Sequence, residues 1–145
     1  MVGHITAAEL AHHTSAVEAA NGFLNRLLFI ACRRHRLLPE GGDLDPLAGT
    51  GIEARLGQHL AGARRAGQLR LDLAARVEWC DAYAALSEAG DGLVGSLCAR
   101  AEAHVLRLAM LYALVDGDTT ISTAHLRAGL ALWDYARTHR WWTLG

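Results

Sequence analysis

The chain has 145 residues, of which 52% are hydrophobic and 20% are charged, enough for one folded domain with a buried core. Its formal net charge of −1 excludes a general basic field for nucleic acid and leaves local patches as the source of such contacts. The three cysteines lack metal-ligand spacing, no apolar run reaches the ~18 residues of a membrane span, and no signal-peptide pattern opens the chain. We therefore expect a cytoplasmic protein with reduced thiols and no membrane partner.

The first predicted element is a short β-type piece, VGHI at residues 2–5, which leads directly into a helix. Thr6 is placed to cap that helix, and Glu9, three residues later, completes a capping box. A second short helix is expected over residues 15–20, where the dipeptide NG ends it.

The apolar run at residues 23–32 fits either a strand or a helix by periodicity alone. Its length and its flanking turn signals favour a buried strand. Residues 37–51 contain both prolines and many glycines, which predicts a loop or hinge.

The middle of the chain begins with a predicted amphipathic helix at residues 52–66, whose apolar stripe consists of Ile52, Leu56, Leu60 and Ala63. Residues 68–72, QLRLD, fit a short extended piece, and Asp72 can cap a helix that reaches about residue 88. The glycine-rich stretch 88–96 then predicts a break.

Residues 97–115 are the predicted central core helix, because their second half is apolar on most sides. In the first half, Arg100, His104 and Arg107 recur at i, i+4 and i+7 and are expected to share one face. After a turn at DGDTT, Ser122 caps the last helix. The predicted fold class is mainly α: a lid-type helical bundle with one or two short N-terminal β-strands.

Four blocks of sequence, taken together, carry a family resemblance. They read GHIT..EL (3–10), NGFLNRLLFIACRRHRLLPEGG (21–42), LDLAARVEW...Y..LSE (71–88) and GLVGSLCARAEAHVLRLAMLYALVDGDTTISTAHLRAGLALWDYA (92–136). In this order and spacing they resemble the C-terminal part of P-loop ATPases encoded by plasmids, phages and integrated elements. Those proteins are helicase-like replication proteins, often fused to a primase–polymerase domain.

The resemblance implies that residues 1–42 are a remnant of the end of an ATPase core and that residues 43–145 form a helical lid-like domain. The family's phosphate-binding loop ends in GK[ST], and this chain, which has no lysine, contains no such loop. The resemblance therefore implies a fragment that binds no nucleotide alone, with ATP and Mg²⁺ held by the complete parent protein. The implied partner is a P-loop-containing chain or a further copy in a homo-oligomer.

Residues 24–30, LNRLLFI, resemble a segment of minichromosome-maintenance-like ATPases whose arginine enters the site of the neighbouring subunit. The resemblance makes Arg26 a candidate arginine finger, which would stabilise charge on the phosphoryl group in transfer. The alternative is an arginine that pairs locally with an acid such as Glu18.

The stretch CARAEAHVLRLA resembles the lid helix whose arginine reaches the nucleotide phosphates, so Arg100 is a candidate for nucleotide sensing. The alternative is a solvated stripe at the edge of a core helix. Arg107 lies among apolar neighbours and is expected to form an interior ion pair with Glu102 or Asp134.

His4 closes the expected first strand, where ATPases of this type place a residue that orients the attacking water. The alternative is an ordinary histidine near a chain end. Further candidates for contact with phosphate or nucleic acid are Arg33, Arg34, Arg36, Trp141 and Trp142. The alternative for the arginines is a solvated strand end and loop, and the alternative for the tryptophans is a tail that packs on the domain or on a partner.

The sequence shows no HExxH motif and no Cys/His set with zinc spacing, so we expect no metal site. The serines lie in no nucleophile-elbow pattern. The first functional hypothesis is thus a replication-ATPase fragment that supplies arginines in trans. The alternatives are a free-standing helical interaction or DNA-binding module, and a truncation without function.

Overall fold

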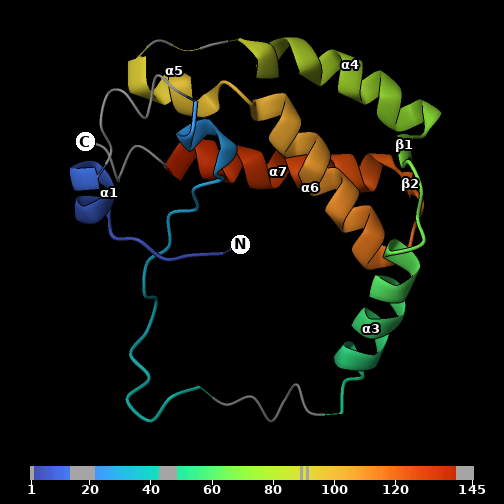
Figure 1. Ribbon diagram of the computed structural model, residues 1–145, viewed down its shortest axis with the longest axis horizontal. Helices are drawn as coiled ribbons and strands as arrows, with labels where there is room; N and C mark the ends of the chain where they lie inside the picture. Colours follow the sequence, from blue (N-terminus) through green and yellow to red (C-terminus); the bar gives the residue numbers. More distant parts are fainter. Residues whose placement is uncertain (1, 14–21, 43–48, 89, 91, 140–145) are drawn as a thin grey trace.

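The computed structural model describes residues 2–13, 22–42, 49–88, 90 and 92–139, and it is mainly helical, as predicted (Figure 1). Two short strands, β1 (Arg70–Leu71) and β2 (Thr120–Ile121), pair in parallel. The helices are α1 (Ala7–His13), the 3-10 turn η1 (Leu24–Arg26), α3 (Ile52–Ala63), α4 (Leu73–Ser87), α5 (Gly92–Cys98), α6 (Ala101–Asp116) and α7 (Thr123–His139).

Each strand runs directly into a capped helix. Arg70 lies opposite Thr120 and Leu71 opposite Ile121, and the Asp72 N–H donates to the Ile121 carbonyl at 3.0 Å. The Asp72 carboxylate then accepts from the Ala75 N–H at 2.7 Å, which satisfies a free donor at the start of α4. The paired strands therefore make α4 and α7 start side by side, and the extended piece predicted at residues 68–72 is confirmed.

The core lies between α6 and α7, which run side by side through the middle of the molecule (Figure 1). Small side chains repeat every four residues along α6, so one narrow stripe of that helix faces α7 at short range. On α7, Leu126 and Ala136 are fully buried and Trp133 is 4% exposed. The buried stripe of α6 consists of Ala101, Val105, Ala109 and Ala113.

The capping box at the N-terminus is also confirmed. The Glu9 carboxylate accepts from the Thr6 N–H at 3.0 Å, while Thr6 Oγ1 accepts from the Glu9 N–H at 3.2 Å. Thus both free donors at the start of α1 are satisfied by side chains three residues away. The helix predicted at residues 15–20 lies outside the described residues.

The two predicted N-terminal strands are wrong. Residues 2–6 have no regular structure, and the run at 23–32 forms only η1 before it continues without a helix or strand. A strand is stabilised by the backbone of a neighbouring strand, and the described part of the chain offers none to either segment. Leu28 packs against the core and the Ala31 carbonyl accepts from the Tyr135 hydroxyl of α7 at 3.1 Å, after which the chain leads away from the helical body (Figure 1).

Two boundaries in the middle of the chain also differ from the prediction. The glycine-rich stretch 88–96 is not a simple break, because α5 begins at Gly92. A Cβ on Gly95 would lie 1.6 Å from the Gly90 carbonyl oxygen, so the missing side chain allows the preceding turn to press against α5. The central helix consequently begins at Ala101, after a two-residue turn, and not at residue 97.

The apolar stripe of α3 is present but is not buried. Ile52, Leu56 and Leu60 are each between 44% and 49% exposed, and no residue of α3 is buried. The helix ends at Ala63, three residues before the predicted end. The amphipathic pattern predicted the helix correctly. It did not predict that the apolar side of the helix would stay exposed to solvent.

Candidate functional site

Arg26 lies on an anchored support, although its own side chain is exposed. Leu24, two residues earlier, is 7% exposed, and the Asn25 carbonyl accepts a hydrogen bond from His104 Nε2 at 2.9 Å. The His104 ring is buried and stacks on Trp133, with ring centroids 5.6 Å apart and an angle of 11° between the planes. The backbone that carries Arg26 is therefore fixed to the core of α6 and α7.

The guanidinium of Arg26 makes a local contact with the main chain. Its Nη1 donates to the carbonyl of Gly22, at the other end of the turn. This contact orients the side chain without burying it. Glu18, the acid considered as a local partner for Arg26, lies outside the described residues.

The predicted shared face of Arg100, His104 and Arg107 is wrong. Arg100 precedes α6 with φ −130° and ψ 29°, so it lies outside the regular helix. His104 points into the core, whereas Arg107 is exposed. Arg100 is the N-cap residue of α6 and its carbonyl accepts the first helical hydrogen bond from the His104 N–H, so the three residues differ in burial and not in helical register.

Arg107 also lacks the predicted interior ion pair. Among the described residues it forms no salt bridge, and Asp134 pairs instead with Arg137 at 2.9 Å. One part of the arginine prediction does gain a structural link, because the His104 N–H donates to the Arg100 carbonyl at 3.0 Å. His104 therefore connects the main chain at Arg100 with the main chain beside Arg26.

The other candidates lie apart from this support. His4 is exposed on the irregular segment before α1, so the predicted position at the end of a buried strand is wrong. The basic cluster on the segment after η1 is exposed throughout, and it comprises Arg33, Arg34 and Arg36. Trp141 and Trp142 lie outside the described residues.

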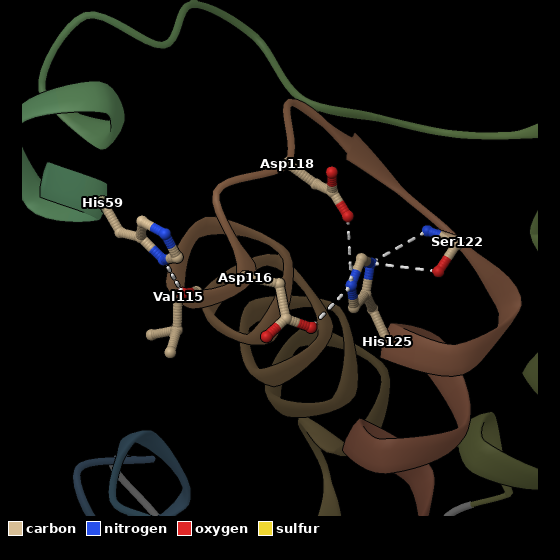
Figure 2. Close-up of polar contacts among 6 residues, drawn as sticks. All are labelled: His59, Val115, Asp116, Asp118, Ser122 and His125. Atoms are coloured by element: carbon tan, nitrogen blue, oxygen red, sulfur yellow. Dashed lines mark hydrogen bonds and ion pairs between the residues drawn. The ribbon is translucent and has the colours of Figure 1, made fainter. Parts of the chain in front are cut away.

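A polar cluster that the sequence did not predict surrounds His125 at the start of α7 (Figure 2). The imidazole is 6% exposed, and its Nδ1 accepts from the Ser122 N–H at 3.1 Å. Its Nε2 therefore carries the proton, which it donates to the Asp116 carboxylate at 3.1 Å, with the Asp118 carboxylate 3.6 Å away. A Ser-x-x-His sequence thus takes the place of the Ser-x-x-Glu capping box.

Ser122, His125 and Asp116 follow the order hydroxyl, imidazole and carboxylate that is known from hydrolases. Two observations argue against a nucleophile here. His125 Nδ1 has one lone pair, which already accepts from the Ser122 N–H at 3.1 Å. Ser122 Oγ also lies 3.1 Å from Nδ1, but it must share that lone pair with the N–H, so Nδ1 is a poor base for the hydroxyl proton. The imidazole is moreover buried beneath its own turn. We interpret the cluster as a cap that fixes the turn between α6 and α7.

His59 of α3 approaches the same turn from the opposite side. Its Nδ1 donates to the Val115 carbonyl near the end of α6 (Figure 2). Between the two helices lies a hollow of about 270 Å³, lined on one side by His59 and Ala66 and on the other by Asp116 and Asp118. These contacts hold α3 against the end of α6 although its apolar stripe remains exposed.

Arg127 of α7 pairs with Glu78 of α4. The hydrogen bond and the charge of Glu78 raise the pKa of Arg127, whose Nε donates to Glu78 Oε1 at 2.9 Å. This pair joins α7 to α4 at the surface. Because Arg127 is exposed, the pair is a structural link of modest strength.

Within the described residues, no three His, Cys, Asp or Glu side chains are grouped to hold a metal ion. None of the helices in that part of the chain is long and apolar enough to cross a membrane. Comparison of the chain with known protein families, with curated proteins and with solved structures gives no match. The resemblance to replication ATPases therefore rests on the sequence blocks alone.

Proposed function

We propose that this chain supplies arginines in trans to a P-loop ATPase of the type found in mobile-element replication proteins, and that it hydrolyses no ATP alone. The observation that carries the proposal is the support of Arg26. An arginine that acts in a neighbouring subunit must be exposed, and it must be held in place so that little order is lost when it enters the site. Arg26 combines an exposed side chain with a backbone anchored through Leu24 and through the His104 hydrogen bond.

The other exposed arginines near it lack this combination. Arg33, Arg34 and Arg36 lie on a segment without helix or strand, so the fold does not fix their backbone in the same way. Arg100 stays the second candidate through the resemblance alone, because its carbonyl only accepts the ordinary first hydrogen bond of α6, from the His104 N–H.

Exposed apolar side chains in the same half of the molecule support the proposal of a partner chain. Large apolar side chains remain exposed from η1 to α3, and a partner chain that covers them would bury them at a gain of roughly 25 cal/mol per Å². ATP and Mg²⁺ would be held by the partner, since this chain has no GK[ST] loop. The exposed apolar residues of this region are Phe23, Ile30, Leu37, Leu38, Ile52, Leu56 and Leu60.

The test uses the reading frame that lies directly upstream of this gene. If it encodes a GK[ST] loop and an acidic strand, its product is co-purified with this chain, and ATP hydrolysis is measured with and without Arg26→Ala. We expect the wild-type chain to stimulate hydrolysis and Arg26→Ala to remove roughly 10³-fold or more of that stimulation. Arg55→Ala, at an exposed arginine of α3, is the matched control and should leave it unchanged.

Two outcomes would refute the proposal: the absence of any upstream phosphate-loop sequence, or full stimulation by Arg26→Ala. The exposure of three arginines within four residues then favours the second candidate, a helical module that binds nucleic acid through Arg33, Arg34 and Arg36. Its affinity for duplex DNA should fall as the salt concentration rises. The triple alanine variant should reduce the slope of the logarithm of the binding constant against the logarithm of the salt concentration by up to about three. Alanine at three exposed arginines in and directly after α3 should not do so, namely Arg55, Arg64 and Arg65.

A further inference from the structure

The helix α4 has two apolar sides, and only one of them packs against its own chain. Ala75 is fully buried, and Trp79 and Leu86 pack against the core. On the opposite side, Leu73 is 85% exposed and Val77 is 65% exposed. Figure 1 shows α4 at the edge of the molecule, so this outer side is open to a partner.

The outer side continues along the whole helix. Cys80 and Ala84 are also exposed, and they follow Leu73 and Val77 at spacings of four, three and four residues. This is the spacing of a coiled-coil seam, with Leu73 and Cys80 at d positions and Val77 and Ala84 at a positions. A β-branched residue at a and a leucine at d favour two parallel strands.

Charges beside the seam specify the partner. Arg76 falls at the g position on one flank and Asp81 at the e position on the other, and both are exposed. Neither forms a salt bridge with any described residue. In a parallel pair, the g residue of one helix lies near the e residue of the next heptad of the other, so Arg76 of each copy meets Asp81 of its mate.

From this self-complementary arrangement we infer that the outer side of α4 binds the same side of a second copy of this chain, in a parallel two-stranded seam. An antiparallel arrangement would place e beside e and bring two Asp81 carboxylates together, so the charges select the parallel one. The seam spans only about two heptads, so the dimer is weak and depends on concentration. The inference does not depend on the role proposed for Arg26.

The thiols make this arrangement measurable. At a d position on the two-fold axis, Cys80 of one copy faces Cys80 of the other. Diamide can accept two hydrogens from these thiols and leave one Sγ–Sγ bond. Cys32 is exposed and Cys98 is partly exposed, so either could form a competing disulfide. The test chain therefore carries Cys32→Ser and Cys98→Ser, and the same chain with Cys80→Ser added, which has no cysteine, is the blank.

We expect diamide to convert the test chain largely to a disulfide dimer and the blank not at all. Arg76→Asp replaces two attractions by repulsions and should raise the dimer Kd, measured by sedimentation, roughly tenfold. Adding Asp81→Arg should restore the dimer. Leu73→Asp should abolish it while it leaves the monomer folded, because Leu73 is the first residue of α4, where a carboxylate is favourable.

The matched control is Leu111→Asp, at an exposed leucine of α6, which should leave the dimer intact. A chain that sediments as a monomer at all concentrations and forms no more disulfide dimer than the blank would overturn the inference. If the dimer Kd of the Arg76→Asp, Asp81→Arg double variant stays as high as that of Arg76→Asp alone, the parallel register is overturned. A dimer that stimulates no ATP hydrolysis would support this inference and count against the proposed function.

Discussion

The two halves of the described chain are stabilised very differently. From α4 to α7, the chain holds one core cluster, and α4 and α7 start at the paired strands; among the described residues, every buried hydrophobic residue except Leu24 lies in this half. From residue 2 to the end of α3, the apolar residues stay largely at the surface, and the chain is attached at a few points such as His59 and Asn25. An apolar run in a sequence therefore identifies a surface that will be buried, but not whether its own chain buries it.

The largest expected difference between the halves is at an aromatic residue. Trp133→Ala should lower the free energy of unfolding by about 3–5 kcal/mol, because it leaves a cavity beside His104 in the core. Phe23→Ala, at a side chain that is 56% exposed, should change it by less than about 1 kcal/mol. Urea unfolding followed by circular dichroism measures both, and equal losses would mean that the halves share one core.

Glycine substitutions should have opposite signs in the two halves. A Cβ on Gly129 of α7 would lie 2.9 Å from the Val105 carbonyl, so Gly129→Ala should push α6 and α7 apart and cost about 1–3 kcal/mol. A Cβ on Gly57 of α3 meets nothing within 4 Å, so Gly57→Ala should add up to about 1 kcal/mol to helix stability. Thermal unfolding of the two variants checks this, and a stable Gly129→Ala would refute the close helix contact.

Removal of a helix cap should have a global effect in one half and a local effect in the other. Asp72→Ala leaves the Ala75 N–H unpaired and should cost about 0.5–2 kcal/mol of global stability. Thr6→Ala breaks the capping box of α1 and should speed hydrogen exchange there without changing the unfolding midpoint. A shift of that midpoint by Thr6→Ala would show that α1 belongs to the cooperative core.

The smallest expected effect is at the link between the halves. His104→Phe keeps an aromatic ring beside Trp133 but removes the donor to the Asn25 carbonyl, at a cost of about 0.5–1.5 kcal/mol. The amide protons of Arg26 and Leu27, which bond within η1, should then exchange faster. Unchanged exchange at these two amides would show that η1 is held in place by other contacts.

Local signals in the sequence predicted most of the second half and one cap of the first. The caps at Thr6 and Asp72 were recognised from their residue types, and the apolar sides of α6 and α7 from their patterns. Ser122 lies at the predicted start of α7, but its hydroxyl contacts His125 Nδ1. The strand prediction at residues 23–32 failed because a strand depends on a neighbour that the local pattern does not contain. The common face of Arg100, His104 and Arg107 failed because the chain packs over His104, which is buried, and leaves Arg107 exposed.

The candidate site was predicted only in part. The choice of Arg26 came from a resemblance, whereas its anchoring depends on the contact between Asn25 and His104, which lie 79 residues apart in the sequence. The cluster around His125 was missed, although the Ser-x-x-His spacing of its cap is visible in the sequence. Contacts across such separations follow from tertiary packing and not from any local pattern.

The central claim is that Arg26 acts on a nucleotide held by another chain. The measurement that tests it most directly is the ATP hydrolysis rate of the co-purified upstream product and this chain, with wild-type, Arg26→Ala and Arg55→Ala versions compared at equal complex concentration. We predict a loss of roughly 10³-fold or more for Arg26→Ala, unchanged hydrogen exchange in η1, and no loss for Arg55→Ala. Equal rates for all three versions, in a complex that hydrolyses ATP, would contradict the role of Arg26.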